Sequence, residues 1–127
     1  MNHSGQAIRA VVDYYKVSVA NLLVAYDELD LPAGVCRLKQ GGGHGGHNGL
    51  RDIFRHLNDH EFLRLRIGIG HPGSKDAVTN YVLGKPAADQ EKMMLRGIDE
   101  AIAVLPDVLA GQLPKAMKAL HTVENDA

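Results

Sequence analysis

Six glycines fall within positions 41–49, and this run constrains the fold more than any other part of the chain. Glycine adds no side chain to a core, so it is used where the backbone needs a positive φ or where another molecule must approach closely. The run leads into Leu50, Ile53, Phe54 and Leu57, an apolar set at helical spacing. The sequence therefore predicts a bare, flexible loop that feeds a helix N-terminus, where unpaired N–H groups favour an anionic or carbonyl-bearing ligand.

A flexible linker is the alternative interpretation of this run. Linkers usually mix glycine with serine, and they lack the paired histidines and the amide found at His44, His47 and Asn48. The segments on either side are both well patterned, which favours a functional loop. A nucleotide-binding P-loop is excluded, because the Lys-Ser/Thr pair that closes that motif is missing.

Length and composition limit the class of protein. At 127 residues the chain is long enough for one domain with a real core. It contains no apolar stretch of membrane-spanning length, and its first residues do not resemble a signal peptide. Its single cysteine, Cys36, excludes an internal disulfide framework and fits a reducing cytosol. We expect Cys36 to be an ordinary buried residue and not a nucleophile.

Positive charge gathers around the glycine run, although the formal net charge of the chain is −1. Between Val35 and Lys85, eight lysines and arginines stand against four acids, and five of the seven histidines lie there too. This distribution fits a surface that faces phosphates. Charge alone fits an ordinary solvated face equally well.

Apolar spacing predicts four helices. The first carries Ala7, Ile8, Val11, Val12 and Tyr15 at helical spacing, with Ser4 or Asn2 as its N-cap. The second follows the glycine run and extends to about Leu57, the others cover about 89–109 and 113–120, and residues 76–83 are ambiguous. The third helix carries Pro106, which is expected to bend or end it. Its predicted apolar face comprises Met94, Ile98, Ala101, Ile102 and Leu105.

Three strands are predicted between these helices. Residues 21–26 form a short apolar run that suggests a strand buried on both faces. Residues 35–39 alternate, with Arg37 and Lys39 on one face and Cys36 and Leu38 on the other. Residues 63–69 alternate strictly, which places Arg64 and Arg66 together on the polar face.

Alternating helices and strands indicate an α/β fold, with a mixed twisted sheet flanked by helices in a single domain. Ligands of such folds gather beyond the carboxyl ends of strands. Asp27, Glu28 and Asp30 follow one predicted strand, and the glycine run follows another. We therefore expect carboxylates and the His47–Asn48 pair to converge on one site. Asp30, before Leu-Pro, is expected to cap its own turn, whereas Asp27 is expected to be functional.

Three ordered motifs closely resemble the bacterial peptidyl-tRNA hydrolases. They are Val24-Ala-Tyr-Asp-Glu-Leu-Asp-Leu-Pro32, Gly41-Gly-Gly-His-Gly-Gly-His-Asn-Gly-Leu50 and Arg64-Leu-Arg-Ile-Gly-Ile-Gly-His-Pro-Gly73. Residues 1–5 and 81–86 resemble the same family, so that one such domain would cover residues 1–127. The resemblance implies a cytoplasmic, monomeric α/β esterase without metal or cofactor. It would free stalled peptides by cleaving their ester to the 3′ end of tRNA, a step of ribosome rescue in translation.

The resemblance also implies roles for individual residues. The family's motif aspartate falls on Asp27, which would orient the catalytic histidine. Its glycine-loop asparagine falls on Asn48, which would hold the attacking water or stabilise the oxyanion. The implied substrate-binding residues are Asn2, Gly45, Gly46 and His47. The basic residues that would meet tRNA phosphates are Lys39, Arg66 and Lys75.

The family's catalytic histidine lies in an Arg-His-Asn-Ala-Gly type motif, which does not occur in this sequence. Met1 corresponds to an internal methionine of the family, so about the first third of the family domain, with several strands, is expected to be absent. We expect slow hydrolysis or none, and self-association through exposed sheet edges. A non-catalytic RNA-binding fragment of the same fold is the alternative.

Two further alternatives carry less weight. The density of family motifs argues against an unrelated phosphate-binding α/β domain. In place of the missing histidine, His3, His44 or His47 could act as the base, although no spacing places one of them against Asp27. A metal held by His44, His47 and Asp27 is disfavoured, because a glycine loop is not rigid enough to hold its ligands.

Overall fold

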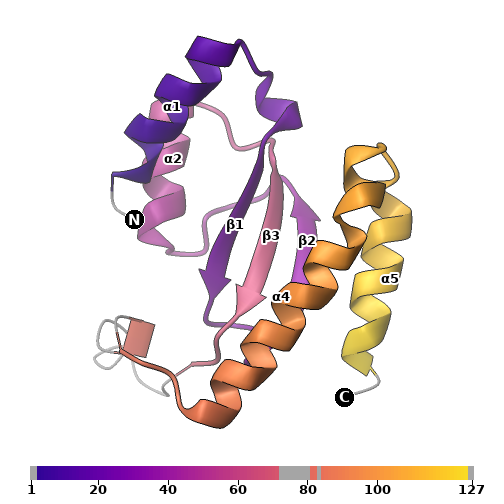
Figure 1. Ribbon diagram of the computed structural model, residues 1–127. Coiled ribbons are helices and arrows are strands. Elements are labelled where there is room, and N and C mark those ends of the chain that lie inside the picture. The colour runs from indigo at the N-terminus through magenta and orange to yellow at the C-terminus, as the bar shows by residue number, and fades with distance from the viewer. Residues whose placement is uncertain (1–2, 72–80, 83, 126–127) are drawn as a thin grey trace. The chain divides into compact units, whose positions relative to one another are not determined.

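The computed structural model describes residues 3–71, 81–82 and 84–125, and it shows a mixed α/β fold (Figure 1). This confirms the predicted fold class. The elements are, in chain order, α1 (Ser4–Tyr15), a short 3-10 helix (Val19–Asn21), β1 (Leu23–Glu28), β2 (Cys36–Gln40), α2 (Asn48–Leu57), β3 (Leu63–Gly68), α4 (Ala88–Leu109) and α5 (Leu113–Asn125).

The three strands form one mixed sheet in the order β1-β3-β2. Strand β3 runs parallel to β1 and antiparallel to β2, as the backbone hydrogen bonds at the strand ends show. In the parallel pair, the N–H of Leu63 donates to the carbonyl of Leu22 at 2.9 Å and that of Ile69 to Glu28 at 3.0 Å. In the antiparallel pair, the N–H of Gly41 donates to Phe62 at 3.0 Å and that of Gly68 to Val35 at 2.8 Å.

The chain divides into two compact units. Unit 1 comprises Met1–Val24 and Lys39–Arg64, and unit 2 comprises Ala25–Leu38 and Leu65–Ala127. Helices α1 and α2 pack side by side in unit 1, and α4 and α5 do so in unit 2 (Figure 1).

In unit 1 a glycine lets α1 approach α2 very closely. A Cβ atom at Gly5 would lie 2.3 Å from the carbonyl oxygen of Asp52. The N–H of Gly5 donates to the buried carboxylate of Asp52 at 2.8 Å. The predicted cap of α1 is therefore wrong for Ser4: His3 is the N-cap, without a side-chain cap bond, and Ser4 is the first helical residue. A first-turn N–H finds its acceptor on α2 instead, and Asn2, the other predicted cap, lies outside the described residues.

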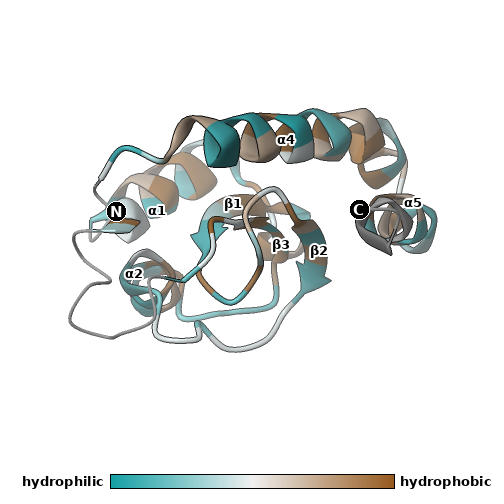
Figure 2. Ribbon diagram, turned by 90° about the horizontal axis from the view of Figure 1, so that it is seen from below, coloured by the Kyte–Doolittle hydropathy of each residue, from teal (hydrophilic) through white to brown (hydrophobic). Residues whose placement is uncertain are grey.

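A second glycine contact lies in unit 2. A Cβ atom at Gly97 of α4 would lie 2.2 Å from the carbonyl oxygen of Gly34. This contact sets which face of α4 is buried, namely that of Gly97, Ala101 and Val104. Ile102 was predicted on the apolar face, but it is 55% exposed. Figure 2 shows both apolar and polar segments along α4, and Pro106 lies inside this helix without ending it.

The structure confirms the prediction for β2 and corrects the prediction for β1. In β2, Cys36 and Leu38 are buried and Arg37 and Lys39 are exposed, as the alternation predicted. Strand β1 begins two residues later than expected, because residues 19–21 form the 3-10 helix. It is not buried on both faces, since Ala25 is exposed. Most of the ambiguous segment 76–83 lies outside the described residues.

Candidate active site

The glycine loop of unit 1, residues 41–47, is ordered by its own histidines. Nδ1 of His47, the N-cap of α2, accepts a hydrogen bond from the N–H of Leu50 at 3.1 Å. Nδ1 of His44 accepts from the N–H of Gly46 at 3.0 Å, and the carbonyl of His44 accepts from the N–H of His47 at 2.9 Å. Gly45 and Gly46 have φ values of 57° and 81°, which favour glycine. Both imidazoles accept through Nδ1, so in this arrangement each carries its ring proton on Nε2.

Arg64 holds the middle of the same loop. Its side chain is fully buried, at 0% exposure. Its Nη1 donates to the carbonyl of Gly43 at 2.5 Å, and its Nη2 donates to the carbonyls of Gly42 at 2.5 Å and His60 at 2.8 Å. The prediction that Arg64 shares an exposed polar face with Arg66 is therefore wrong. Nothing lies within 4 Å of a Cβ atom built at Gly43, Gly45 or Gly46, so this part of the loop is bare, as predicted. The flexibility of the loop stays a prediction.

Two aromatic rings line the burial site of Arg64. The carbon at the centre of its guanidinium lies 4.9 Å from the ring centre of Phe54 and 4.8 Å from that of Phe62. Carbonyl acceptors and ring faces together replace the water that a guanidinium would otherwise keep. This explains how an arginine can occupy a buried position on β3.

The candidate site residues of unit 1 lie along or beside this loop. Asn48 is the first residue of α2, and it is exposed. Lys39 is exposed and lies against the loop, since a Cβ atom at Gly42 would lie 2.8 Å from its Nζ. Unit 1 thus brings together Lys39, Gly45, Gly46, His47 and Asn48 from the predicted site.

The end of β1 carries the predicted residues of unit 2. Asp27 is half-buried and lies inside β1, not beyond it, because the strand continues to Glu28. Glu28 binds Arg66 through its Oε1, at 3.0 Å from Nε and 2.9 Å from Nη2. Arg66 was predicted to meet phosphates, and sequence patterning missed this ion pair. Asn2 and Lys75 lie outside the described residues.

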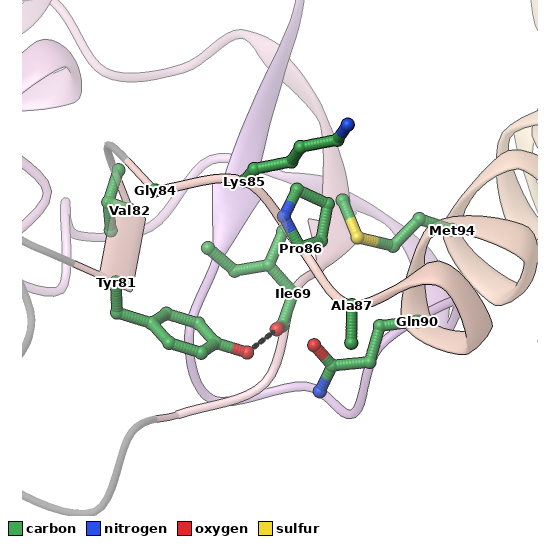
Figure 3. A pocket seen from close by; sticks show the side chains of 9 residues that line it. All are labelled: Ile69, Tyr81, Val82, Gly84, Lys85, Pro86, Ala87, Gln90 and Met94. Carbon is green, nitrogen blue, oxygen red and sulfur yellow. Dashed lines mark hydrogen bonds between the residues drawn. The ribbon is translucent and has the colours of Figure 1, made fainter.

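A separate pocket of about 260 Å³ lies in unit 2 (Figure 3). At one end the hydroxyl of Tyr81 points at the carbonyl of Ile69 and donates a hydrogen bond to it (Figure 3). No candidate residue from the described part of the chain lines the pocket. Its lining residues are Ile69, Tyr81, Val82, Gly84, Lys85, Pro86, Ala87, Gln90 and Met94.

The described residues offer neither a metal cluster nor a membrane span. Among residues 3–71, 81–82 and 84–125, no group of three or more His, Cys, Asp or Glu side chains is arranged to hold a metal ion. None of the helices in the described part of the chain combines the length and the apolar character needed to cross a membrane. Cys36 is buried, as expected.

These features define a mixed α/β protein whose glycine-rich loop presents an asparagine at a helix N-terminus. The model of the peptidyl-tRNA hydrolase family matches residues 1–127. The chain belongs to the peptidyl-tRNA hydrolase family.

Individual relatives are similar over most of this chain. The peptidyl-tRNA hydrolase of Pseudomonas putida strain F1 is 56% identical over 124 residues, which cover 96% of this chain and 63% of the relative. That of Coxiella burnetii strain RSA 493 is 50% identical over 122 residues, covering 96% and 65%. The crystal structure of the Acinetobacter baumannii peptidyl-tRNA hydrolase has a TM-score of 0.91 and 48% identity, covering 94% of this chain and 61% of that one.

The chain thus spans slightly less than two thirds of the length of these relatives. The family match begins at residue 1 of this chain. The comparisons give the share of each relative that is covered and not which part of it, so the expectation that the first third of the family domain is missing is not supported.

Proposed function

We propose that the chain acts in peptidyl-tRNA hydrolysis, as a carboxylic ester hydrolase that cleaves the bond between a peptide and the 3′ end of tRNA. The observation that carries this proposal is the ordered glycine loop, which holds the exposed side chain of Asn48 at the start of α2. Membership of the peptidyl-tRNA hydrolase family supports it. The proposed setting is the cytoplasm, and the proposed partner is peptidyl-tRNA.

In this proposal Asn48 acts on the reacting ester. Its amide holds the attacking water or donates a hydrogen bond to the oxyanion that forms at the ester carbonyl. The N-terminus of α2 adds partial positive charge at the same place. Asp27 orients the imidazole that takes the proton from water, as a carboxylate does in triad-like sites.

The histidines of the glycine loop are poorly arranged to be that base. A general base must accept a proton on a ring nitrogen that is not already committed. In His44 and His47 the unprotonated nitrogen, Nδ1, already accepts a backbone N–H. The base proposed here is the histidine of the family's Arg-His-Asn-Ala-Gly motif, which these 127 residues do not contain.

The substrate-binding proposal follows the surface of the loop. Gly45, Gly46 and His47 face the substrate, and Asn2 binds its peptide end. Lys39 meets tRNA phosphates most directly, because its ammonium lies exposed against the loop. Lys75 and Arg66 are proposed as further phosphate contacts, with Arg66 the weaker because Glu28 already neutralises much of its charge.

The missing histidine motif favours a second candidate, a chain that binds tRNA without cleaving it. Peptide release from peptidyl-tRNA separates the two. We expect the 127-residue chain to release peptide slowly or not at all, and a form extended by the family's histidine motif to recover turnover. In that form Asn48→Ala should lower kcat by about 100-fold, as expected for loss of one oxyanion donor. Equal rates for the short and extended forms would show that another residue serves as base.

A further inference from the structure

We propose that Arg64 is a positioning residue that sets the path of the glycine loop and, through it, the position of Asn48. Its consequence for hydrolysis rests on the proposed function, whereas its effect on the loop does not. The proposal uses a buried cation that no step of the proposed mechanism requires. Its basis is the set of contacts that Arg64 makes on both the loop and α2.

A series of hydrogen bonds runs along the loop from Arg64 to the start of α2. Arg64 holds the carbonyls of Gly42 and Gly43, directly before His44. His44 closes the next turn by accepting from the N–H groups of Gly46 and His47. His47 then caps α2, whose first residue is Asn48. Each step fixes the starting point of the next.

Arg64 also contacts helix α2 itself. The guanidinium lies over Phe54, which belongs to α2, and the ring of His44 also lies 5.7 Å from the ring of Phe54. Arg64 therefore joins the segment before the turn to the helix after it. A loop rich in glycine has few other means of resisting motion, because its residues contribute no side chains.

The contacts at position 64 require an arginine and not a lysine. A guanidinium presents several donors in a fixed planar fork, and it stacks on aromatic rings. Here the fork reaches three carbonyl groups, those of Gly42, Gly43 and His60. An ammonium has its donors on one nitrogen, so lysine cannot reproduce this arrangement. At 0% exposure, Arg64 is also closed to a phosphate ligand.

Amide hydrogen exchange on the 127-residue chain tests this proposal. In Arg64→Met, which keeps much of the volume, the amides of Gly46, His47 and Leu50 should exchange at least about tenfold faster. The amide of Gly5, bonded to Asp52, should keep its protection. Arg64→Lys should also lose loop protection. Arg9→Met is the matched control, since Arg9 is a partly exposed arginine of unit 1 that pairs with Asp13 on α1.

Chemical rescue makes the test specific for the guanidinium. Ethylguanidinium added to Arg64→Ala should restore loop protection, and it should leave Arg9→Ala unchanged. Loop protection that is equal in wild type, Arg64→Met and Arg64→Lys would overturn the proposal. Should Arg64→Met fail to fold, Arg64→Lys and the rescue decide in the same way.

A kinetic measurement separates this proposal from the proposed function. In a form that hydrolyses peptidyl-tRNA, Arg64→Lys should lower kcat by about tenfold or more through misplacement of Asn48, while KM changes little. A change in KM alone would contradict a positioning role. If no form hydrolyses peptidyl-tRNA, the proposed function fails, and the exchange experiment still decides whether Arg64 orders the loop.

Discussion

Strand β3 carries two arginines, Arg64 in unit 1 and Arg66 in unit 2, and the two are used differently. Arg64 is buried and donates to backbone carbonyls between two rings. Arg66 keeps 23% of its side chain exposed and pairs with the carboxylate of Glu28. The contrast shows that a cation can be structural in one unit and remain near the surface in the other. Burial and the nature of the acceptor decide which role it takes, not the hydropathy pattern of the strand.

The largest expected effect is the loss of folding stability when the buried arginine, Arg64, is replaced. Arg64→Ala leaves three carbonyls without their donor and opens a cavity beside two rings, so unfolding should become easier by about 2–5 kcal/mol. Arg66→Ala should cost only about 0–1 kcal/mol, the range of ion pairs near the surface. Chemical denaturation of both variants measures the difference. Equal losses would mean that burial does not separate the two arginines.

A second test compares glycines within unit 1. Gly5→Ala forces a Cβ to within 2.3 Å of the carbonyl oxygen of Asp52, and we expect it to cost about 1–3 kcal/mol through overpacking. Gly43 has nothing within 4 Å of its Cβ position, so Gly43→Ala should change stability by less than about 0.5 kcal/mol. Urea midpoints for the two variants are the measurement. A large loss in Gly43→Ala would show that the loop is packed on a face left open in this structure.

A third test concerns the cap of α2. His47→Ala removes the acceptor of the Leu50 N–H, and should destabilise the chain by about 1 kcal/mol. His47→Asn keeps a good N-cap side chain and should recover most of that loss. Thermal melts of both variants compare them with wild type. If asparagine fails to recover stability, the imidazole of His47 has a role beyond capping.

The smallest expected effect concerns RNA binding, and it sharpens the comparison between free and paired cations. Lys39→Ala should weaken tRNA binding and lower the salt slope by about 1. Arg66→Ala should lower it by less, because Glu28 already pairs with that guanidinium. Binding titrations at several salt concentrations measure both slopes. Unchanged affinity and slope in both variants would remove the phosphate-binding surface from the proposal.

Local patterning predicted much of this protein. The alternation of Cys36 and Leu38 with Arg37 and Lys39 was confirmed, and so was the helix after the glycine run. The motifs around Asp27 and Asn48 indicated the family that the comparisons then showed. Such features depend on neighbours in the chain, because period and turn chemistry act over a few residues. The roles of Asp27 and Asn48 stay predictions.

Tertiary structure decided the features that depend on distant partners. Arg64 is buried because the loop carbonyls, 21 and 22 residues earlier, accept its hydrogen bonds. The first turn of α1 finds an acceptor on Asp52, 47 residues away. Ile102 is exposed because Gly97 brings another face of α4 against Gly34. Hydropathy periodicity indicates which residues are buried because they are apolar. A polar group is buried only where hydrogen-bond partners surround it, and only the folded chain brings those partners together.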